Sequence, residues 1–189
     1  REAFFDSLLR GESGVIDLTA WRPGVFDDLP TRIGAPNLDL APGTDLTPKE
    51  VRRMDKVHQY AVCAGKRALR DAGLWGDDLD ALDKTKCGVL LGSAMGGMQV
   101  YEDNVVALTT RGIKKVSPFT VPYMLTNMSG AILGMQAELG FRGPNYAVNT
   151  ACATSNYQFI NAAQHIRAGQ ADVILAGGAE AAVTPMGLG

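Results

Sequence analysis

The last third of the sequence contains the feature that most restricts the fold. Residues 145–150 have the character of a strand, residues 155–168 have helical character and end at Gly169, and residues 172–176 form a short apolar run. A strand, a helix and a second strand within about 30 residues predict a βαβ unit with a right-handed crossover. The chain is therefore expected to be an α/β protein with parallel strands.

A further buried strand is predicted earlier in the chain. Residues 87–92 are a continuous apolar run bounded by glycines, which is typical of a strand buried on both faces of a sheet. A glycine-rich loop follows at residues 93–97. It lacks the Gly-Lys-Ser/Thr of a P-loop and the spacing of a dinucleotide fingerprint, so nucleotide binding is not predicted.

The clearest helix start begins at Thr47, which is a good N-cap. Proline follows at the first helical position, and Glu50 completes a capping box. This helix is predicted to continue to Ala72 and to end at a left-handed Gly73. At 100° per residue it has an apolar face and an opposite cationic face. The cationic face comprises Lys49, Arg52, Arg53 and Lys56.

The other segments are predicted from weaker patterns. Helices are expected at residues 1–10, 98–110 and 122–139, and irregular segments at residues 11–46 and 184–189. Small residues on one face of the helix at 122–139 would permit close packing on another backbone, and they are Gly130, Ala131, Gly134 and Ala137. Because the sequence opens inside a helix and closes in a loop, it is expected to be part of a larger fold.

Composition excludes several classes of protein. The formal net charge is −2 and no long tract is basic, which argues against a nucleic-acid or membrane-surface protein. No apolar run approaches the roughly 20 residues that span a bilayer. The three cysteines, Cys63, Cys87 and Cys152, have no CxxC or Cys/His spacing, so neither a disulfide framework nor a zinc site is predicted.

Cys152 lies where the predicted strand at 145–150 meets the following helix, among small residues. A thiol at such a corner is close to free backbone N–H groups and the helix dipole, which favour the thiolate and can stabilise an oxyanion. Cys152 is therefore a candidate nucleophile. The alternative, a packing cysteine, stays open because free cysteine is among the most buried residue types.

The remaining cysteines and both histidines are predicted to be structural. Cys63 lies inside a helix and Cys87 enters a buried strand. His58 falls on an apolar helix face, and His165 is 13 positions from Cys152, roughly 20 Å along a helix. If Cys152 is catalytic, its partners lie outside this sequence.

Several segments, in order and spacing, resemble the β-ketoacyl-[acyl-carrier-protein] synthases of the thiolase superfamily. These segments are residues 10–14, 53–55, 92–97, 117–119, 127–128, 143–145, 149–156, 165–172 and 176–180. The Ala-Thr-Ser-Asn sequence after Cys152, together with Tyr123, is more similar to the discrete plastid-type and bacterial enzymes than to modular polyketide ketosynthases.

The resemblance implies a thiolase-like fold, in which two similar βαβαβ halves pack as five layers, αβαβα, and the enzyme is a homodimer. Residues 1–189 would be the N-terminal half, with the first strand and the whole C-terminal half absent. The missing half would supply two histidines, a lysine and a further oxyanion-hole amide. A bacterial cytoplasm or a plastid stroma is the implied location.

The implied activity is an acyl transfer followed by a decarboxylating condensation in fatty-acid elongation. Cys152 would take the acyl chain from acyl-carrier protein, and malonyl-carrier protein would supply the attacking carbanion. No metal or redox cofactor is implied, nor any nucleic-acid or membrane partner. Four alternatives are a thiolase, a silent ketosynthase-like partner subunit, a polyketide ketosynthase and a non-enzymatic product; Cys152 argues against the first two.

The resemblance also implies roles for other residues. Met95 would gate the acyl tunnel beside Cys152, or else simply fill a gap in its loop. Residues that would line the partner subunit's acyl pocket are Thr120, Met124 and Leu125; the first of these departs from a frequently aromatic position, so chain-length preference is open. Residues that would dock the acidic carrier protein, unless they are merely a solvated face, are Lys49, Arg52, Arg53, Lys114 and Lys115.

Overall fold

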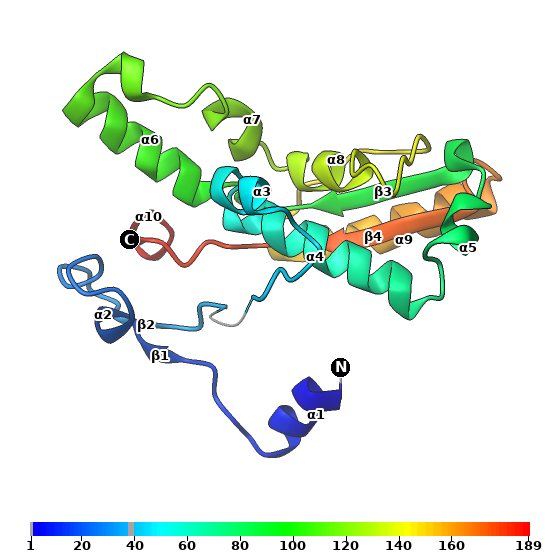
Figure 1. Cartoon of the computed structure of the whole chain (residues 1–189). Coiled ribbons are helices and arrows are strands. Elements are labelled where there is room, and N and C mark those ends of the chain that lie inside the picture. The colour runs from blue at the N-terminus through cyan, green and yellow to red at the C-terminus, as the bar shows by residue number, and fades with distance from the viewer. Residues whose placement is uncertain (1, 38–39) are drawn as a thin grey trace. The chain divides into compact units, whose positions relative to one another are not determined.

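The computed structural model describes residues 2–37 and 40–189 of the chain (Figure 1). It divides into two compact units, one formed by residues 1–40 and 183–189 and the other by residues 41–182. No helix in the described ranges is long and apolar enough to cross a membrane.

The first unit consists of short elements joined by irregular segments, as predicted for residues 11–46. Its elements are α1 (Glu2–Leu9), β1 (Ile16–Asp17), α2 (Leu18–Trp21), β2 (Ile33–Gly34) and α10 (Pro185–Leu188). β1 and β2 pair in antiparallel orientation. Leu18 and Phe26 are fully buried, and the ring of Trp21 stacks on that of Phe26, so the unit has a small apolar core of its own.

The second unit contains the parallel sheet. Its helices and strands are α3 (Pro48–Arg53), α4 (Lys56–Asp71), α5 (Asp77–Asp80), β3 (Cys87–Gly92), α6 (Met98–Arg111), α7 (Thr120–Met124), α8 (Met128–Gly134), α9 (Thr154–Arg167) and β4 (Val173–Gly178). Single-turn 3-10 helices occur at Lys84–Lys86, Ile113–Lys115 and Ala151–Ala153. β3 and β4 run parallel, from Cys87 opposite Val173 to Gly92 opposite Gly178, which confirms the predicted α/β class.

Helices cover the sheet in layers. α9 packs on both strands, α8 packs on β3, and α4 packs on α8 (Figure 1). Gly130 makes the α8 contact possible, because a β-carbon there would come within 2.8 Å of the backbone oxygen of Leu91. The predicted close-packing face is therefore present at Gly130 and at buried Gly134, whereas Ala137 lies beyond the end of α8 and is exposed.

The predicted helix at residues 47–72 is wrong in one respect, because it is broken into α3 and α4. Met54 is extended, and the Asp55 side chain accepts a hydrogen bond from Val57 N at 3.0 Å and so caps α4. The capping box at Thr47 and the left-handed Gly73, with φ of 73°, are both confirmed.

The predicted helix at residues 122–139 is likewise two helices, α7 and α8. Between them the carbonyl oxygen of Thr126 accepts a hydrogen bond from Ser93 N, so the backbone serves a neighbouring segment instead of a continuous helix. Residues 184–189, predicted as a loop, contain the single turn α10, which the Thr184 side chain caps by accepting from Gly187 N.

The predicted strand at residues 145–150 is also wrong. Asn145 alone forms an isolated parallel bridge, with Val89, and the following residues join no ladder within the described chain. The strand that pairs with β4 is β3, so the parallel connection spans α6 to α9 instead of a single helix.

Candidate active site

Cys152 lies at the start of a helix, as the sequence predicts, but the segment before it is not a strand. This segment leads into the 3-10 turn Ala151–Ala153, and α9 begins immediately afterwards. Ala151 has φ of 50° and is the one non-glycine residue with positive φ in the described chain. Such a conformation costs roughly 1–2 kcal/mol for an L-residue. The corner presents an exposed Cys152 thiol next to the N-terminus of a 14-residue helix.

The thiol opens into a pocket of about 420 Å³ at the carboxyl ends of β3 and β4. In parallel α/β sheets, ligands bind at this end of the strands. The lining residues are Gly92, Ser93, Ala94, Met95, Ala151, Cys152, Thr154, Ser155, Gly178, Ala179 and Glu180.

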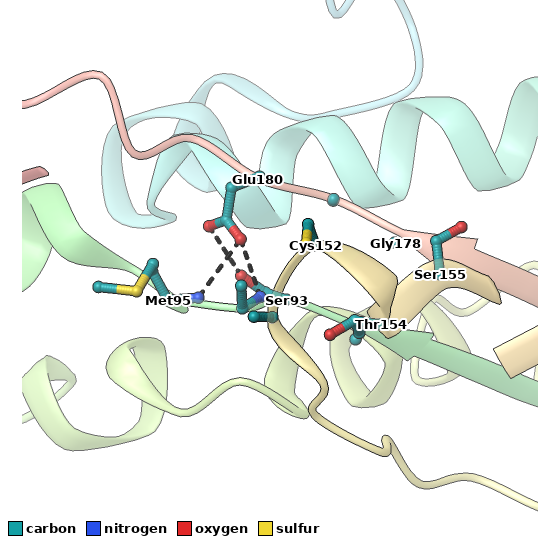
Figure 2. A pocket seen from close by; sticks show the side chains of 11 residues that line it. Ser93, Met95, Cys152, Thr154, Ser155, Gly178 and Glu180 are labelled. Carbon is teal, nitrogen blue, oxygen red and sulfur yellow. Dashed lines mark hydrogen bonds between the residues drawn. The ribbon is translucent and has the colours of Figure 1, made fainter. Parts of the chain in front are cut away.

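A carboxylate joins the two strand ends across this pocket. Glu180 follows β4, and its oxygens accept hydrogen bonds from Ser93 Oγ at 3.0 Å, Ala94 N at 2.8 Å and Met95 N at 3.3 Å (Figure 2). Charge-assisted hydrogen bonds of this kind are about twice as strong as neutral ones. The start of the loop that follows β3 is therefore bound by one side chain from the end of β4.

Two more side chains extend this network. Ser93, which is buried, accepts a hydrogen bond from Gly96 N at 2.8 Å through the hydroxyl that it donates to Glu180. Asn149 donates to the Ala94 carbonyl oxygen at 3.1 Å and accepts from Ala151 N at 3.2 Å. The loop at residues 93–97 and the cysteine corner are thus connected by hydrogen bonds.

The other cysteines and histidines have structural surroundings. Cys63 and Cys87 are buried, and burial raises the pKa of both thiols. His58 bonds through its ring nitrogens to Ser129 Oγ and the Tyr123 carbonyl oxygen, and burial lowers its pKa.

His165, at the far end of α9, bonds to the Tyr146 hydroxyl and to the side chain of Gln170. Each histidine of the sequence therefore has hydrogen-bond partners other than the Cys152 thiol.

The whole sequence, residues 1–189, matches the family described as "Beta-ketoacyl synthase, N-terminal domain". The chain belongs to this family. It is 45% identical over 188 residues to chloroplastic 3-oxoacyl-[acyl-carrier-protein] synthase I of Arabidopsis thaliana, covering 100% of this chain and 39% of that protein. It is 37% identical to 3-oxoacyl-[acyl-carrier-protein] synthase 2 of Vibrio cholerae, covering 99% and 43%. The chain thus spans about two fifths of the length of these relatives.

Solved ketosynthases have the same thiolase-like fold. The ketosynthase in a complex with its type II polyketide acyl-carrier protein matches with a TM-score of 0.73 and 27% identity, covering 79% of this chain and 42% of that chain. The ishigamide ketosynthase/chain length factor matches with a TM-score of 0.79 over 100% of this chain and 45% of that chain; at 24% identity this likeness shows the fold.

In this ketoacyl synthase domain the predicted acyl-pocket residues separate into two places. Met95 lines the pocket around Cys152. Thr120 and Met124 are the first and last residues of α7, and Leu125 follows them; within the described chain none of the three lines that pocket. Their predicted place in a partner subunit's pocket stays a prediction.

The predicted docking cations of the ketoacyl synthase domain are all exposed. Three lie on α3 and two in the 3-10 helix Ile113–Lys115, and they are Lys49, Arg52, Arg53, Lys114 and Lys115. The guanidinium of Arg53 lies 4.3 Å from the centre of the Phe119 ring, which limits its freedom.

Glu180, Ser93 and Asn149 were not assigned roles from the sequence, although each lies in a segment that resembles the family. Their long-range hydrogen bonds join residues 55 to 87 positions apart. No local periodicity predicts such pairs. The available signal was a glutamate directly after a Gly-Gly strand end, which places a carboxylate at the functional edge of a parallel sheet.

Proposed function

We propose that the protein containing this chain is a β-ketoacyl-[acyl-carrier-protein] synthase of fatty-acid elongation. Residues 1–189 would form its N-terminal half. The observation that carries the proposal is the exposed Cys152 thiol on a strained corner, beside the start of α9, in a chain of this family.

In the first step the Cys152 sulfur attacks the thioester carbonyl of an acyl-carrier protein. A new carbon–sulfur bond forms at Cys152, the bond to the carrier's sulfur breaks, and the carrier leaves as a thiol with the proton that Cys152 has given up. Backbone N–H groups at the start of α9 stabilise the oxyanion that forms on the carbonyl oxygen.

In the second step malonyl-carrier protein loses CO₂. The electron pair of the broken carbon–carbon bond attacks the carbonyl carbon of the Cys152 thioester, and the sulfur leaves as thiolate, which gives a β-ketoacyl chain two carbons longer. The histidines and lysine that this step requires belong, in this proposal, to the second half of the enzyme, since His58 and His165 have other hydrogen-bond partners.

Met95 serves in this proposal as the gate of the acyl chain. The residue is 52% exposed and lines the pocket, and its side chain is unbranched, so it can rotate to admit an alkyl chain. Figure 2 shows it extended away from Cys152. Thr120, Met124 and Leu125 would line the pocket of a partner subunit.

The proposed partners are acyl- and malonyl-carrier protein and a second copy of the enzyme. The exposed cations of α3 and of Ile113–Lys115 suit an acidic carrier. Residues 145–150, which join no ladder in the described chain, would pair across the two-fold axis of the dimer. Sedimentation of the intact protein at micromolar concentration tests this assembly, and a monomer would contradict it. Plastid stroma or bacterial cytoplasm is the proposed location.

Malonyl-dependent elongation by the intact protein tests the proposed activity. The wild-type protein should lengthen an acyl-carrier substrate by two carbons, and Cys152→Ala should abolish the reaction. Cys63→Ala is the matched control, because that thiol is buried away from the pocket, and it should leave elongation intact. A wild-type protein that yields no acyl chain lengthened by two carbons, because it is inactive or makes a polyketide instead, would contradict the proposal.

A further inference from the structure

The loop at residues 93–97 is held at both ends by carboxylates from distant parts of the second unit. At its start, Glu180 accepts hydrogen bonds from the backbone N–H groups of Ala94 and Met95. Just beyond its end, buried Asp55 accepts from Val100 N at 2.9 Å, in the first turn of α6. The backbone of this loop is thus fixed independently of the Met95 side chain that it presents.

The loop is also tied to its surroundings along its length. Gly97 N donates to the Tyr123 carbonyl oxygen, and a β-carbon at Gly96 would strike the carbonyl oxygen of Met124. Gly96 has φ of 65°, a conformation that favours glycine. The loop therefore has no room to shift toward α7.

The Met95 residue therefore has a fixed backbone and a free side chain. Glu180 accepts a hydrogen bond from its N–H, while the side chain is half exposed and extends away from Cys152 (Figure 2). A gate works reproducibly when its pivot stays in place and only the side chain rotates. Glu180 provides that pivot.

We infer that Glu180 is a positioning residue that fixes the pivot of Met95 and thereby controls which acyl chains reach Cys152. This inference rests on the proposed function of Met95 as the gate. Glu180 need not contact the acyl chain or the reacting carbonyl, because it acts through the backbone of residues 93–95. Its carboxylate is specifically suited, since one group accepts from a hydroxyl and two N–H groups at once.

Reagent-size discrimination at Cys152 tests this inference in the intact protein. Labelling rates are measured with iodoacetamide and with N-dodecyl iodoacetamide, each mapped to Cys152 by mass spectrometry. The preference for the small reagent is the ratio of the iodoacetamide rate to the N-dodecyl iodoacetamide rate. Glu180→Gln should lower this ratio roughly tenfold, which is the effect of losing one charge-assisted hydrogen bond. Glu12→Gln, which alters an exposed carboxylate bonded to Arg10, should leave the preference unchanged.

A double variant shows whether Glu180 acts through Met95. In a Met95→Ala background, Glu180→Gln should change the preference less than about twofold, because the gating side chain is already absent. Ser93→Ala removes one Glu180 partner and should shift the preference in the same direction as Glu180→Gln. Agreement between the two variants would show that the shift does not come from a folding defect of one of them.

An unchanged preference in Glu180→Gln, or an equal effect with and without Met95, would overturn the inference. Labelling requires neither carrier protein nor malonyl groups. A protein that fails to elongate acyl chains but responds to Glu180→Gln would therefore refute the proposed function and leave the positioning role standing.

Discussion

Two regions of the second unit contain the same chemical groups, a cysteine and a carboxylate, and use them differently. Within α4, Cys63 is 1% exposed, and Asp45, packed nearby at 4%, accepts hydrogen bonds from Arg67 at 3.0 Å and Arg70 at 2.6 Å. At the strand ends, Cys152 is exposed and Glu180 binds the N–H groups of a loop.

The difference lies in the partners and in access to solvent. Burial alone would raise the pKa of Asp45, but the hydrogen bonds from Arg70 and Arg67 outweigh it and hold the pKa below its usual value. Buried Lys66 donates to the Asp45 carbonyl oxygen and pairs with Glu138, so this region is closed and electrostatically satisfied. A carboxylate that binds cations there stabilises the fold, whereas one that binds a backbone loop beside an open thiol arranges a site.

Thiol reactivity is the property in which the two regions should differ most. Iodoacetamide should label Cys152 roughly a thousandfold or more faster than Cys63 or Cys87, because the buried thiols react only when the structure opens. Burial also raises the pKa of both buried thiols, so raising the pH to 9 should not remove the difference. Mass-spectrometric mapping of the native protein gives the rates. Preferential labelling of Cys63 would reject Cys152 as the reactive thiol.

Removing each carboxylate charge should separate stability from reactivity. Asp45→Asn should lower the free energy of unfolding by about 2 kcal/mol, because two charge-assisted hydrogen bonds to a buried group are weakened. Glu180→Gln, at an exposed side chain, should change it much less. Denaturant unfolding measures both, with the exposed Asp28→Asn as the control for charge alone.

The effect of Asp45→Asn should also depend on pH. The folded-state pKa of Asp45 is lowered, so its charge contributes stability above the unfolded value of about 4 and loses that contribution as the pH falls through the folded pKa. The stability difference between the wild type and Asp45→Asn should therefore be complete at pH 7 and shrink below about pH 4. A difference that stays constant down to pH 2 would show that the loss is not electrostatic.

Charge reversal on α3 should affect carrier recognition and leave the thiol site intact. Arg52→Glu with Arg53→Glu should raise the KM for an acidic carrier protein about tenfold and weaken its salt dependence. Cys152 labelling should not change, because neither arginine lines its pocket. The control variant, Arg10→Glu with Arg32→Glu, reverses two exposed charges in the first unit and should leave the KM unaltered. An unchanged KM in the α3 variant would contradict the docking role.

The smallest expected effect concerns the start of α3. Thr47→Ala removes the side chain that accepts from Glu50 N and should lower the free energy of unfolding by about 1 kcal/mol. Thr47→Ser retains the cap and should be nearly neutral. Labelling of Cys152 should be the same in both variants; slower or faster labelling would show that the two regions are coupled.

The sequence predicts those elements whose signals are local. The capping box of α3, the apolar strand β3 and the glycine that ends α9 are determined by neighbouring residues. The break at Asp55 was missed because the helical pattern continues through it, while its carboxylate binds the start of α6, 45 positions away. The predicted strand at 145–150 has strand-like composition, but pairing depends on a neighbour, and within the described chain it has one bridge.

The same distinction holds for the site. Cys152 could be predicted because the corner, the small flanking residues and the helix start are contiguous. Glu180 could not be assigned a role, because its partners Ser93, Ala94 and Met95 come together with it only when β3 and β4 pair. The sequence therefore points to the candidate nucleophile, and the structure shows which residues hold its surroundings.

The left-handed conformation of Ala151 has a consequence for engineering. Glycine would adopt this conformation without the steric cost, so Ala151→Gly should relieve local strain. It would also increase the conformational freedom of the backbone beside Cys152. A screen for thermal tolerance and a screen for turnover would then rank the same substitution in opposite order. Directed evolution that selects for heat resistance first would tend to discard the geometry that presents the thiol.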